Sequence, residues 1–359
     1  MTPRERVAAW LDEHDAEAAW FAEPNTFAWF TGGDNRISTA ADVGAAAVGY
    51  DGESVTVVTD NIEADRLAEE ELPDDANVES FTWYESSLGE AVAETSPDPA
   101  VADFDAPGLG EIDAADLRRP LHDGAIEAYR SLSRDVVEAV ESVLHEAEST
   151  DTEREVTARL QRALTERAIT TPVVLVGSAD RAQAYRHYTV KDEPLGAYAL
   201  VSVTSEREGL YTSLTRTVAF DPPEWLDSRT EAAMCVEATA LAATREVGRA
   251  GGQAKEVFGA IQDAYAEVEY PGEWQLHHQG GAAGYAGREW FGTPDADDTV
   301  RLPMAYAWNP TVQGAKSEGT VLVTGEGIDP LTEPDDWPTT EVEAIGYDLT
   351  IERPAVLER

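Results

Sequence analysis

The segment His277-His278-Gln279-Gly280-Gly281 decides how this chain is interpreted, together with Trp308-Asn309-Pro310 and Lys316-Ser317-Glu318 farther along. The three segments bring two imidazoles, two amides, an ammonium group and a carboxylate into one region of the sequence. We interpret the glycines after the histidines as requirements of a tight turn. So many polar and titratable groups among apolar residues predict a functional site in the C-terminal part of the chain.

Length and composition indicate a folded protein with two domains. The chain has 359 residues, which exceeds the usual size of a single hydrophobic core. A hydrophobic fraction of 42% and nine tryptophans provide enough apolar surface for packed cores. The abundance of charge therefore does not indicate disorder.

Acidic residues dominate the charge, because 70 Asp and Glu against 26 Lys and Arg give a formal net charge of -44. An acidic patch for a basic partner usually forms a block of like charge, whereas here the acids are spread along the chain. Molar salt screens such repulsion to within a few ångströms. We therefore expect a halophilic, haloarchaeal-type protein of a high-salt cytoplasm. Nucleic acid is not an expected partner, since it needs a basic surface.

Other features limit the location and the chemistry. The single cysteine, Cys235, rules out an intrachain disulfide and is interpreted as a small buried residue rather than a nucleophile. No apolar secretion signal follows the first residues, and no run of about 18 apolar residues is present. We expect a cytoplasmic protein that does not associate with membranes.

Hydrophobic patterning predicts a small α/β domain at 1–121 and a more helical domain at 122–359. The first contains a predicted helix at 5–22 and a hairpin turn at Asp51-Gly52. In the second, Thr152 and Glu155 form the capping box of a helix. The other elements expected there are an amphipathic helix from residue 126, a strand at 173–176, a hairpin over 198–220, helices at about 228–247 and 253–268, and two closing strands.

Six segments carry a resemblance to a known family: 25–32, 152–164, 177–187, 214–217, 278–281 and 316–324. In this order they resemble motifs of the creatinase/aminopeptidase P/methionine aminopeptidase superfamily, which includes Xaa-Pro peptidases. The resemblance covers nearly the whole chain. It implies a creatinase-like N-terminal domain, a pita-bread domain of catalytic type with a curved antiparallel sheet flanked by helices, and a homodimer.

Active members of this superfamily bind two divalent metal ions through two Asp, one His and two Glu, because paired hard cations need several anionic oxygens. Carried over by motif, these ligands fall on Ser202, Ser213, His278, Asn309 and Glu318. We expect the two serines to oppose each other across the hairpin. Three of the four carboxylates are thus replaced by poor ligands. The resemblance implies a divergent member without a dinuclear centre or cofactor, with a divalent ion (Mn²⁺, Co²⁺ or Zn²⁺) as the alternative.

Creatinase, in the same superfamily, hydrolyses a C–N bond without metal through a histidine at the position of His187. Histidine suits general acid/base catalysis because its pKa lies near neutrality. The predicted catalytic residues are His187, His278 and Glu318. Neighbouring residues of a strand face opposite sides, so one of the paired histidines is expected to be structural. The predicted substrate-binding residues are Arg216, His277, Tyr285, Arg288, Glu289, Asn309 and Lys316, with the cations assigned to a substrate carboxylate.

Three functions remain open for the sequence. The first is a metal-independent, creatinase-like hydrolase of a small amide, amidine or dipeptide-like substrate. The second is a non-catalytic protein of the same fold that binds a peptide or small ligand. The third is an Xaa-Pro aminopeptidase or dipeptidase that holds a metal weakly. In each case the partner is a small molecule or a short peptide.

Overall fold

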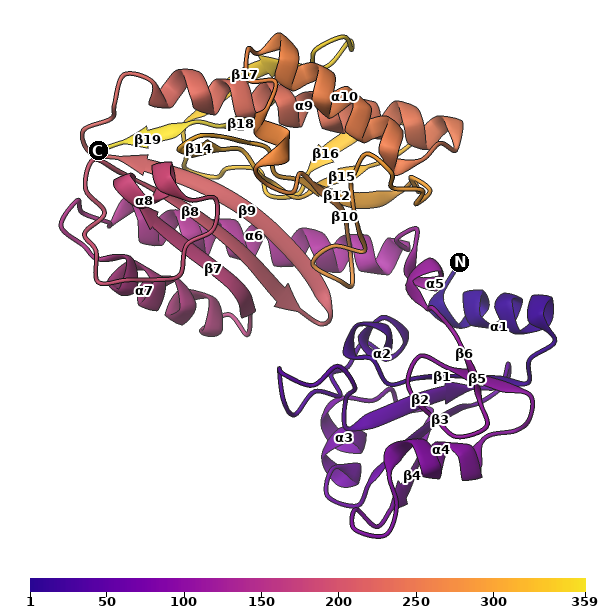
Figure 1. Cartoon of the computed structure of the whole chain (residues 1–359). Helices are drawn as coiled ribbons and strands as arrows, with labels where there is room; N and C mark the ends of the chain where they lie inside the picture. The colour runs from indigo at the N-terminus through magenta and orange to yellow at the C-terminus, as the bar shows by residue number, and fades with distance from the viewer. The chain divides into compact units, whose positions relative to one another are not determined.

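The computed structural model describes all residues from 1 to 359, and contacts group them into two units, Met1–His122 and Asp123–Arg359 (Figure 1). Each unit combines helices with β-sheet, so the predicted α/β (α+β) class is confirmed. No helix combines the length and the apolar character needed to span a membrane.

The N-terminal unit is built on a six-stranded mixed sheet with the order β4-β3-β2-β1-β5-β6. Its strands are β1 (Ala18–Phe21), β2 (Ala46–Tyr50), β3 (Val55–Asp60), β4 (Ala76–Phe81), β5 (Ala100–Ala102) and β6 (Gly110–Glu111). Its helices are α1 (Pro3–His14), α2 (Pro24–Thr31), α3 (Ala64–Glu70), α4 (Leu88–Thr95) and α5 (Ala115–Arg118). The hairpin expected at Asp51-Gly52 joins β2 and β3.

The helix expected over 5–22 is shorter than predicted, and its second half is strand β1. Asp15 ends α1 in the left-handed conformation, with φ 52. Residues Ala18–Phe21 are buried and form β1, which pairs with β2 on one side and β5 on the other. The alanine-rich sequence favours a helix, but pairing inside the sheet overrides this weak local preference.

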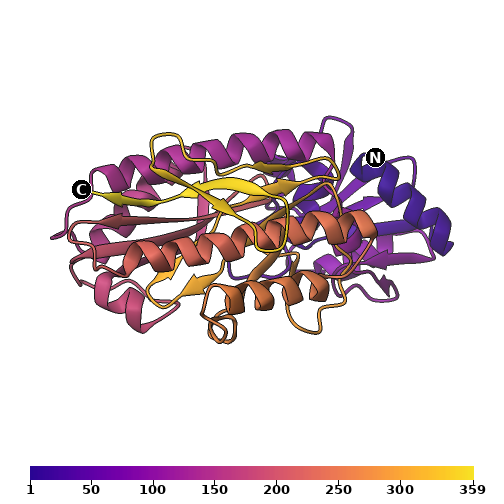
Figure 2. The same ribbon diagram turned by 90° about the horizontal axis from the view of Figure 1, so that it is seen from above.

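The C-terminal unit places curved sheets between long helices, with α6 and α7 on one side and α9 and α10 on the other (Figures 1 and 2). The helices are α6 (Asp123–His145), α7 (Glu153–Thr165), α8 (Ala179–Ala184), α9 (Leu226–Ala250), α10 (Ala254–Glu267) and the 3₁₀ turn η1 (Glu273–Gln275). The capping box of α7 is confirmed, since Thr152 Oγ1 accepts from the Glu155 amide while the Glu155 carboxylate accepts from the Thr152 amide.

One sheet of this unit has the order β19-β9-β8-β7 and the other the order β11-β10-β12-β15-β16. Two small ribbons, β13-β14 and β17-β18, complete it. The strands up to the hairpin are β7 (Thr170–Ser178), β8 (Tyr198–Arg207) and β9 (Leu210–Ala219). After the paired histidines come β10 (Gly280–Ala283), β11 (Trp290–Phe291), β12 (Met304–Trp308), β13 (Thr311–Val312), β14 (Ala315–Lys316), β15 (Val321–Val323), β16 (Ile328–Pro330), β17 (Thr339–Glu343), β18 (Thr350–Pro354) and β19 (Val356–Glu358). The prediction of only two closing strands was wrong.

The two sheets meet where β9 runs beside residues 317–320. The Thr215 amide donates to the Glu318 carbonyl at 3.0 Å, and the Ser213 amide donates to Thr320 Oγ1 at 2.8 Å. The predicted hairpin turn before β9 consists of Glu208 and Gly209, whose φ values of 53 and 78 suit a type I′ turn. The turn fixes the register of β9 against β8, and the junction fixes β9 against Glu318.

Candidate functional site

A buried carboxylate held by two cations lies at the junction of the sheets. Lys316 Nζ lies 2.7 Å from Glu318 Oε2, and an Arg288 Nη lies 3.0 Å from Glu318 Oε1. Glu318 is 5% exposed and Lys316 8% exposed, so all three groups interact at low effective dielectric. Asn309 and Thr215 also donate to the Glu318 carboxylate.

These contacts keep Glu318 ionised. Burial alone would raise the pKa of Glu318, but the charges of Lys316 and Arg288, with hydrogen bonds from Lys316 and Thr215, lower it to about 2. Two cations and one anion leave one net positive charge in this cluster. In a chain with a net charge of -44, this is a local reversal of sign.

Hydroxyl groups line the adjoining face of the hairpin. Ser202 pairs with Thr215 across the strands, and their hydroxyl oxygens are 2.6 Å apart; Thr204 pairs with Ser213, with oxygens 2.9 Å apart. The expectation that Ser202 and Ser213 oppose each other was wrong. The two-residue turn offsets them by one diagonal position on the same face.

The residues at the five positions implied by the resemblance do not fit a dinuclear metal centre. Ser202, Ser213 and Asn309 carry no charge, and the remaining carboxylate, Glu318, is already neutralised by side-chain cations. Lys316 Nζ also contacts Ser202 Oγ at 3.2 Å, and Arg288 contacts Ser213 Oγ at 3.3 Å. The ammonium and guanidinium groups therefore contact the residues that would have to bind the metal ions.

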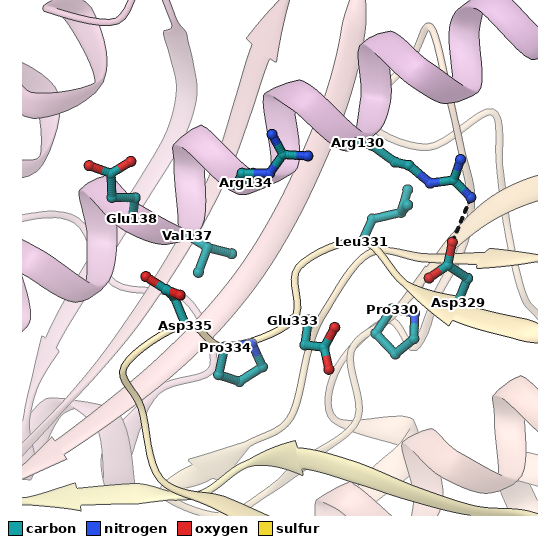
Figure 3. A pocket seen from close by; sticks show the side chains of 10 residues that line it. All are labelled: Arg130, Arg134, Val137, Glu138, Asp329, Pro330, Leu331, Glu333, Pro334 and Asp335. Atoms are coloured by element: carbon teal, nitrogen blue, oxygen red, sulfur yellow. Dashed lines mark hydrogen bonds and ion pairs between the residues drawn. The ribbon is translucent and has the colours of Figure 1, made fainter.

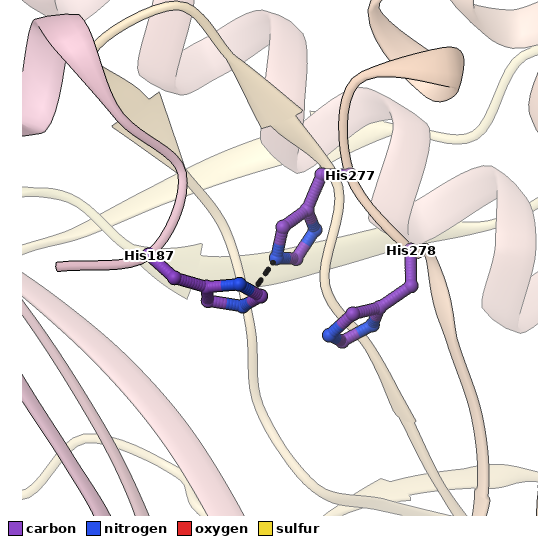
Figure 4. Close-up of side chains that lie close together, drawn as sticks. All are labelled: His187, His277 and His278. Carbon is purple, nitrogen blue, oxygen red and sulfur yellow. Dashed lines mark hydrogen bonds between the residues drawn. The ribbon is translucent and has the colours of Figure 1, made fainter.

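Three histidines lie together beside this cluster (Figure 4). His187 belongs to the loop between α8 and β8, whereas His277 and His278 follow η1. The Nε2 atoms of His187 and His277 are 3.2 Å apart, and the rings of His277 and His278 stack with centroids 4.2 Å apart. The expectation that the paired histidines point to opposite sides was wrong, because they lie in a loop and not in a strand.

The histidines are held in their neutral forms. Burial, followed by the charge of Lys316, lowers the pKa of all three, to about 2 for His277 and about 4 for His278. His187 and His278 remain partly open to solvent, whereas His277 is 7% exposed. At neutral pH, each ring therefore has a nitrogen lone pair able to accept a proton or bind a cation.

An ion pair fixes the two histidine loops to each other. Arg186, next to His187, contacts Glu273 of η1 at 2.6 Å, and both side chains are 15% exposed. Gln279 donates to the His277 carbonyl at 2.7 Å and accepts from the Tyr265 hydroxyl at 2.9 Å. These contacts fix the backbone on either side of the histidines, and none of them involves an imidazole ring.

A cavity of about 430 Å³ connects the ion cluster of Lys316, Arg288 and Glu318 with His187 and His278. Its walls are largely apolar, with the polar groups gathered at one place, an arrangement typical of small-molecule sites. The lining residues are Pro172, Val173, Leu175, His187, Ser202, Val203, Thr204, Tyr211, His278, Gly287, Arg288, Phe291, Asn309, Lys316 and Glu318. Asn309 Oδ1 and Arg288 Nε are buried polar atoms without a protein partner.

Four predicted substrate-binding residues, Arg216, His277, Tyr285 and Glu289, are not among those lining the cavity. Arg216 lies on the other face of β9, where it pairs with Glu141 of α6 at 2.7 Å and is 1% exposed. Alternation along the strand separates it from Thr215, so its assignment to a substrate carboxylate was wrong. Tyr285 and Glu289 shape the loop before β11, where the Tyr285 amide donates to the Glu289 carboxylate at 3.0 Å.

Another surface hollow, of about 380 Å³, lies between α6 and residues 329–335 (Figure 3). Arg130 and Arg134 face Glu138, Asp329, Glu333 and Asp335 there, and Arg130 pairs with Asp329 at 2.8 Å. None of the predicted site residues lines it, and its two arginines face four carboxylates, so it has no net positive charge for an anionic ligand. The cavity beside the histidines is therefore the candidate site.

Comparison with known proteins supports the fold alone. No family profile and no curated protein matches this chain by sequence. Among solved structures, a prolidase from Pyrococcus horikoshii OT3 superposes with a TM-score of 0.74 at 18% identity, over 93% of this chain and 98% of that one. The chain has the pita-bread fold of prolidases. A dipeptidase from the same organism gives a TM-score of 0.75 at 14% identity, over 99% of this chain and 100% of that one.

A third similar structure is the N-terminal domain of the FACT complex subunit SPT16 from Cicer arietinum. It superposes with a TM-score of 0.63 at 13% identity, over 93% of this chain and 97% of that one. The same architecture therefore occurs in peptidases and in a subunit of a complex. The chemistry of this chain has to be argued from its own site.

Sequence reasoning missed several residues that position the site. Arg186, Glu273, Gln279 and Tyr265 were not predicted, because each looks like an ordinary surface or core residue in sequence. Thr215 was read only as part of a motif, although its hydroxyl donates to Glu318. The available signals were the positions of Arg186 directly before His187 and of Gln279 directly after His278.

Proposed function

We propose that this protein hydrolyses a C–N bond in a small amide, amidine or dipeptide-like substrate that bears a carboxylate, without a dinuclear metal centre. The supporting observation is the ion cluster of Lys316, Arg288 and Glu318, which keeps one net positive charge inside a cavity of about 430 Å³. Because Lys316 and Arg288 share a single carboxylate, one of the two buried positive charges is not neutralised. This remaining positive charge attracts an anionic group of a ligand.

The polar groups around the cavity suit the two ends of such a substrate. Lys316 Nζ makes two contacts, to Glu318 and Ser202, and an ammonium group has three donors. Its third donor suits a substrate carboxylate or the oxygen that becomes negative during attack. The unpartnered Asn309 Oδ1 accepts from a substrate N–H, while Val173, Leu175 and Phe291 contact the apolar part.

His187 is the general base in this proposal. Its pKa is lowered by burial and by Lys316, so the ring is neutral at pH 7 and can accept a proton. It takes a proton from water, the resulting hydroxide adds to the substrate carbon, the C–N bond breaks, and the proton passes to the departing nitrogen. Water thus supplies OH to the carbon and H to the nitrogen. Lys316 stabilises the oxyanion that forms meanwhile.

The test is turnover of a panel of N-acyl amino acids, amidino acids and Xaa-Pro dipeptides in molar KCl containing a chelator. We expect hydrolysis of at least one class, a loss of at least a hundredfold in kcat for His187→Ala, and a rise in KM for Lys316→Met. His14→Ala, in the N-terminal unit, is the matched control and should retain full activity. Equal rates for His187→Ala and the native protein would refute the role of the base.

A non-catalytic binding protein is the second candidate. One reason is that three of the four carboxylate metal ligands implied by the resemblance are replaced. The other is that the FACT complex subunit SPT16 is among the similar structures. Calorimetry with the same panel separates the two: saturable binding of a carboxylate-bearing ligand that Lys316→Met abolishes, without any turnover, would support this candidate and overturn the hydrolase.

A further inference from the structure

The three histidines are closer together than a single general base requires. One nitrogen from each of His187, His277 and His278 lies within 4.8 Å of the others. They come from two loops separated by 90 residues between His187 and His277. Figure 4 shows the rings of His187 and His277 meeting edge to edge, with His278 beside them.

We infer that these imidazoles form a binding site for one borderline transition metal ion of the class of Zn²⁺ or Co²⁺. The site shares His278 with the five positions of the carboxylate-rich dinuclear centre that the resemblance implies, but its other two ligands, His187 and His277, are not among them. It goes beyond the proposed function, which needs no metal.

The distances suit this class of ion. Two ligands at Zn–N distances of about 2.0–2.1 Å on a tetrahedral ion lie roughly 3.3 Å apart. The 3.2 Å between the Nε2 atoms of His187 and His277 already matches one edge. A nitrogen of His278 lies within 4.8 Å of the other two, and its side chain is exposed and belongs to a loop, so it has to move closer to complete the site. The fourth position is left for water, as in sites with three protein ligands.

The surrounding contacts preorganise the ligands. The Arg186–Glu273 ion pair joins the two loops at 2.6 Å, and Gln279 fixes the backbone at His277. Outer contacts of this kind orient metal ligands and raise affinity.

The charges nearby limit the affinity and set the selectivity. Lys316 and Arg288 repel a dication, and Glu318 only partly offsets them. We therefore expect weaker binding than in a site with a carboxylate ligand. Three neutral nitrogens favour Zn²⁺, Co²⁺ or Ni²⁺ over the hard ions Mg²⁺ and Mn²⁺, which prefer oxygen.

The test is a titration of the whole protein with Co²⁺ in molar KCl, followed by visible absorption. We expect saturation at one equivalent, with the intense bands of tetrahedral cobalt, displaced by Zn²⁺ and absent with Mn²⁺. His187→Ala, His277→Ala and His278→Ala should each weaken binding at least tenfold. His278→Ala changes an exposed residue, so the result does not depend on whether the buried His277 tolerates substitution.

His145→Ala is the matched control, because His145 lies 4.0 Å from the Asp336 carboxylate and has the features of an adventitious site. Its titration should equal that of the native protein. Absence of a saturable band, or equal affinity in His278→Ala and the native protein, would overturn the inference. Binding is measured without substrate, so its failure is separate from failure of the hydrolase proposal. If the hydrolase proposal and the metal site are both correct, Zn²⁺ bound to His187 blocks the general base and stops turnover.

Discussion

Glu318→Gln should destabilise the C-terminal unit more than any other single loss of charge in the cavity. The amide keeps the shape of the side chain but removes the anion between Lys316 and Arg288, which lie 2.7 and 3.0 Å from it. Breaking a buried ion pair on one side costs about 3–5 kcal/mol, because the remaining charges stay buried and unpaired. The pKa of about 2, against an ordinary value of 4.5, corresponds independently to about 3 kcal/mol.

The pH dependence of this loss has a defined sign. The folded pKa of Glu318 is depressed, so its contribution to stability is complete above about pH 4.5 and falls as the pH drops toward 2. The difference in unfolding free energy between the native protein and Glu318→Gln should therefore be constant from pH 8 to 5. It should shrink at lower pH.

The assay is urea unfolding in molar KCl, followed by tryptophan fluorescence. The exposed Glu326→Gln, in the loop between β15 and β16, is the matched control and should change stability by less than about 0.5 kcal/mol. A loss below about 1 kcal/mol for Glu318→Gln at pH 7 would refute the account, because it would mean that the two cations do not depend on this carboxylate.

Three further predictions concern the surface, the fold and the corrected arginine. Lowering KCl should lower the melting temperature steeply, because repulsion among the charges behind the net -44 is then unscreened; a salt-independent melting curve would contradict this. Gly280→Ala should prevent folding, since φ is +93 and the new Cβ would lie 2.1 Å from the Ala307 carbonyl oxygen. The control Gly259→Ala, where a Cβ on α10 meets open space, should raise the free energy of unfolding by up to about 1 kcal/mol in thermal unfolding. Arg216→Met should destabilise by about 3–5 kcal/mol by leaving Glu141 unpaired, yet leave the ligand affinity of the folded protein unchanged by calorimetry.

The elements that could be predicted are those with a strong local cause. Short sequence patterns predict two such features, the capping box at Thr152 and Glu155 and the turn with positive φ at Glu208 and Gly209. Strand β1 could not be predicted, because its alanines favour a helix and only pairing with β2 and β5 makes it a strand. The many short strands after residue 280 also depend on distant partners.

The site shows the same division. Motif order brought His187, Asn309, Lys316 and Glu318 into one predicted set, and the structure places all four along one cavity. Their interactions could not be read from the sequence, since the contacts of Lys316 and Arg288 with Glu318 depend on how two sheets meet. Arg216 was misassigned because a motif does not state which face of its strand points to the cavity.

The most direct test of the central claim is the binding of manganese, measured by equilibrium dialysis and elemental analysis in molar KCl. Side-chain cations contact the positions where a dinuclear centre would need ligands, so the account predicts no specific manganese and no difference between the native protein and Glu318→Gln. Two equivalents per chain, lost in Glu318→Gln and retained in His187→Ala, would contradict the account and identify a two-metal peptidase.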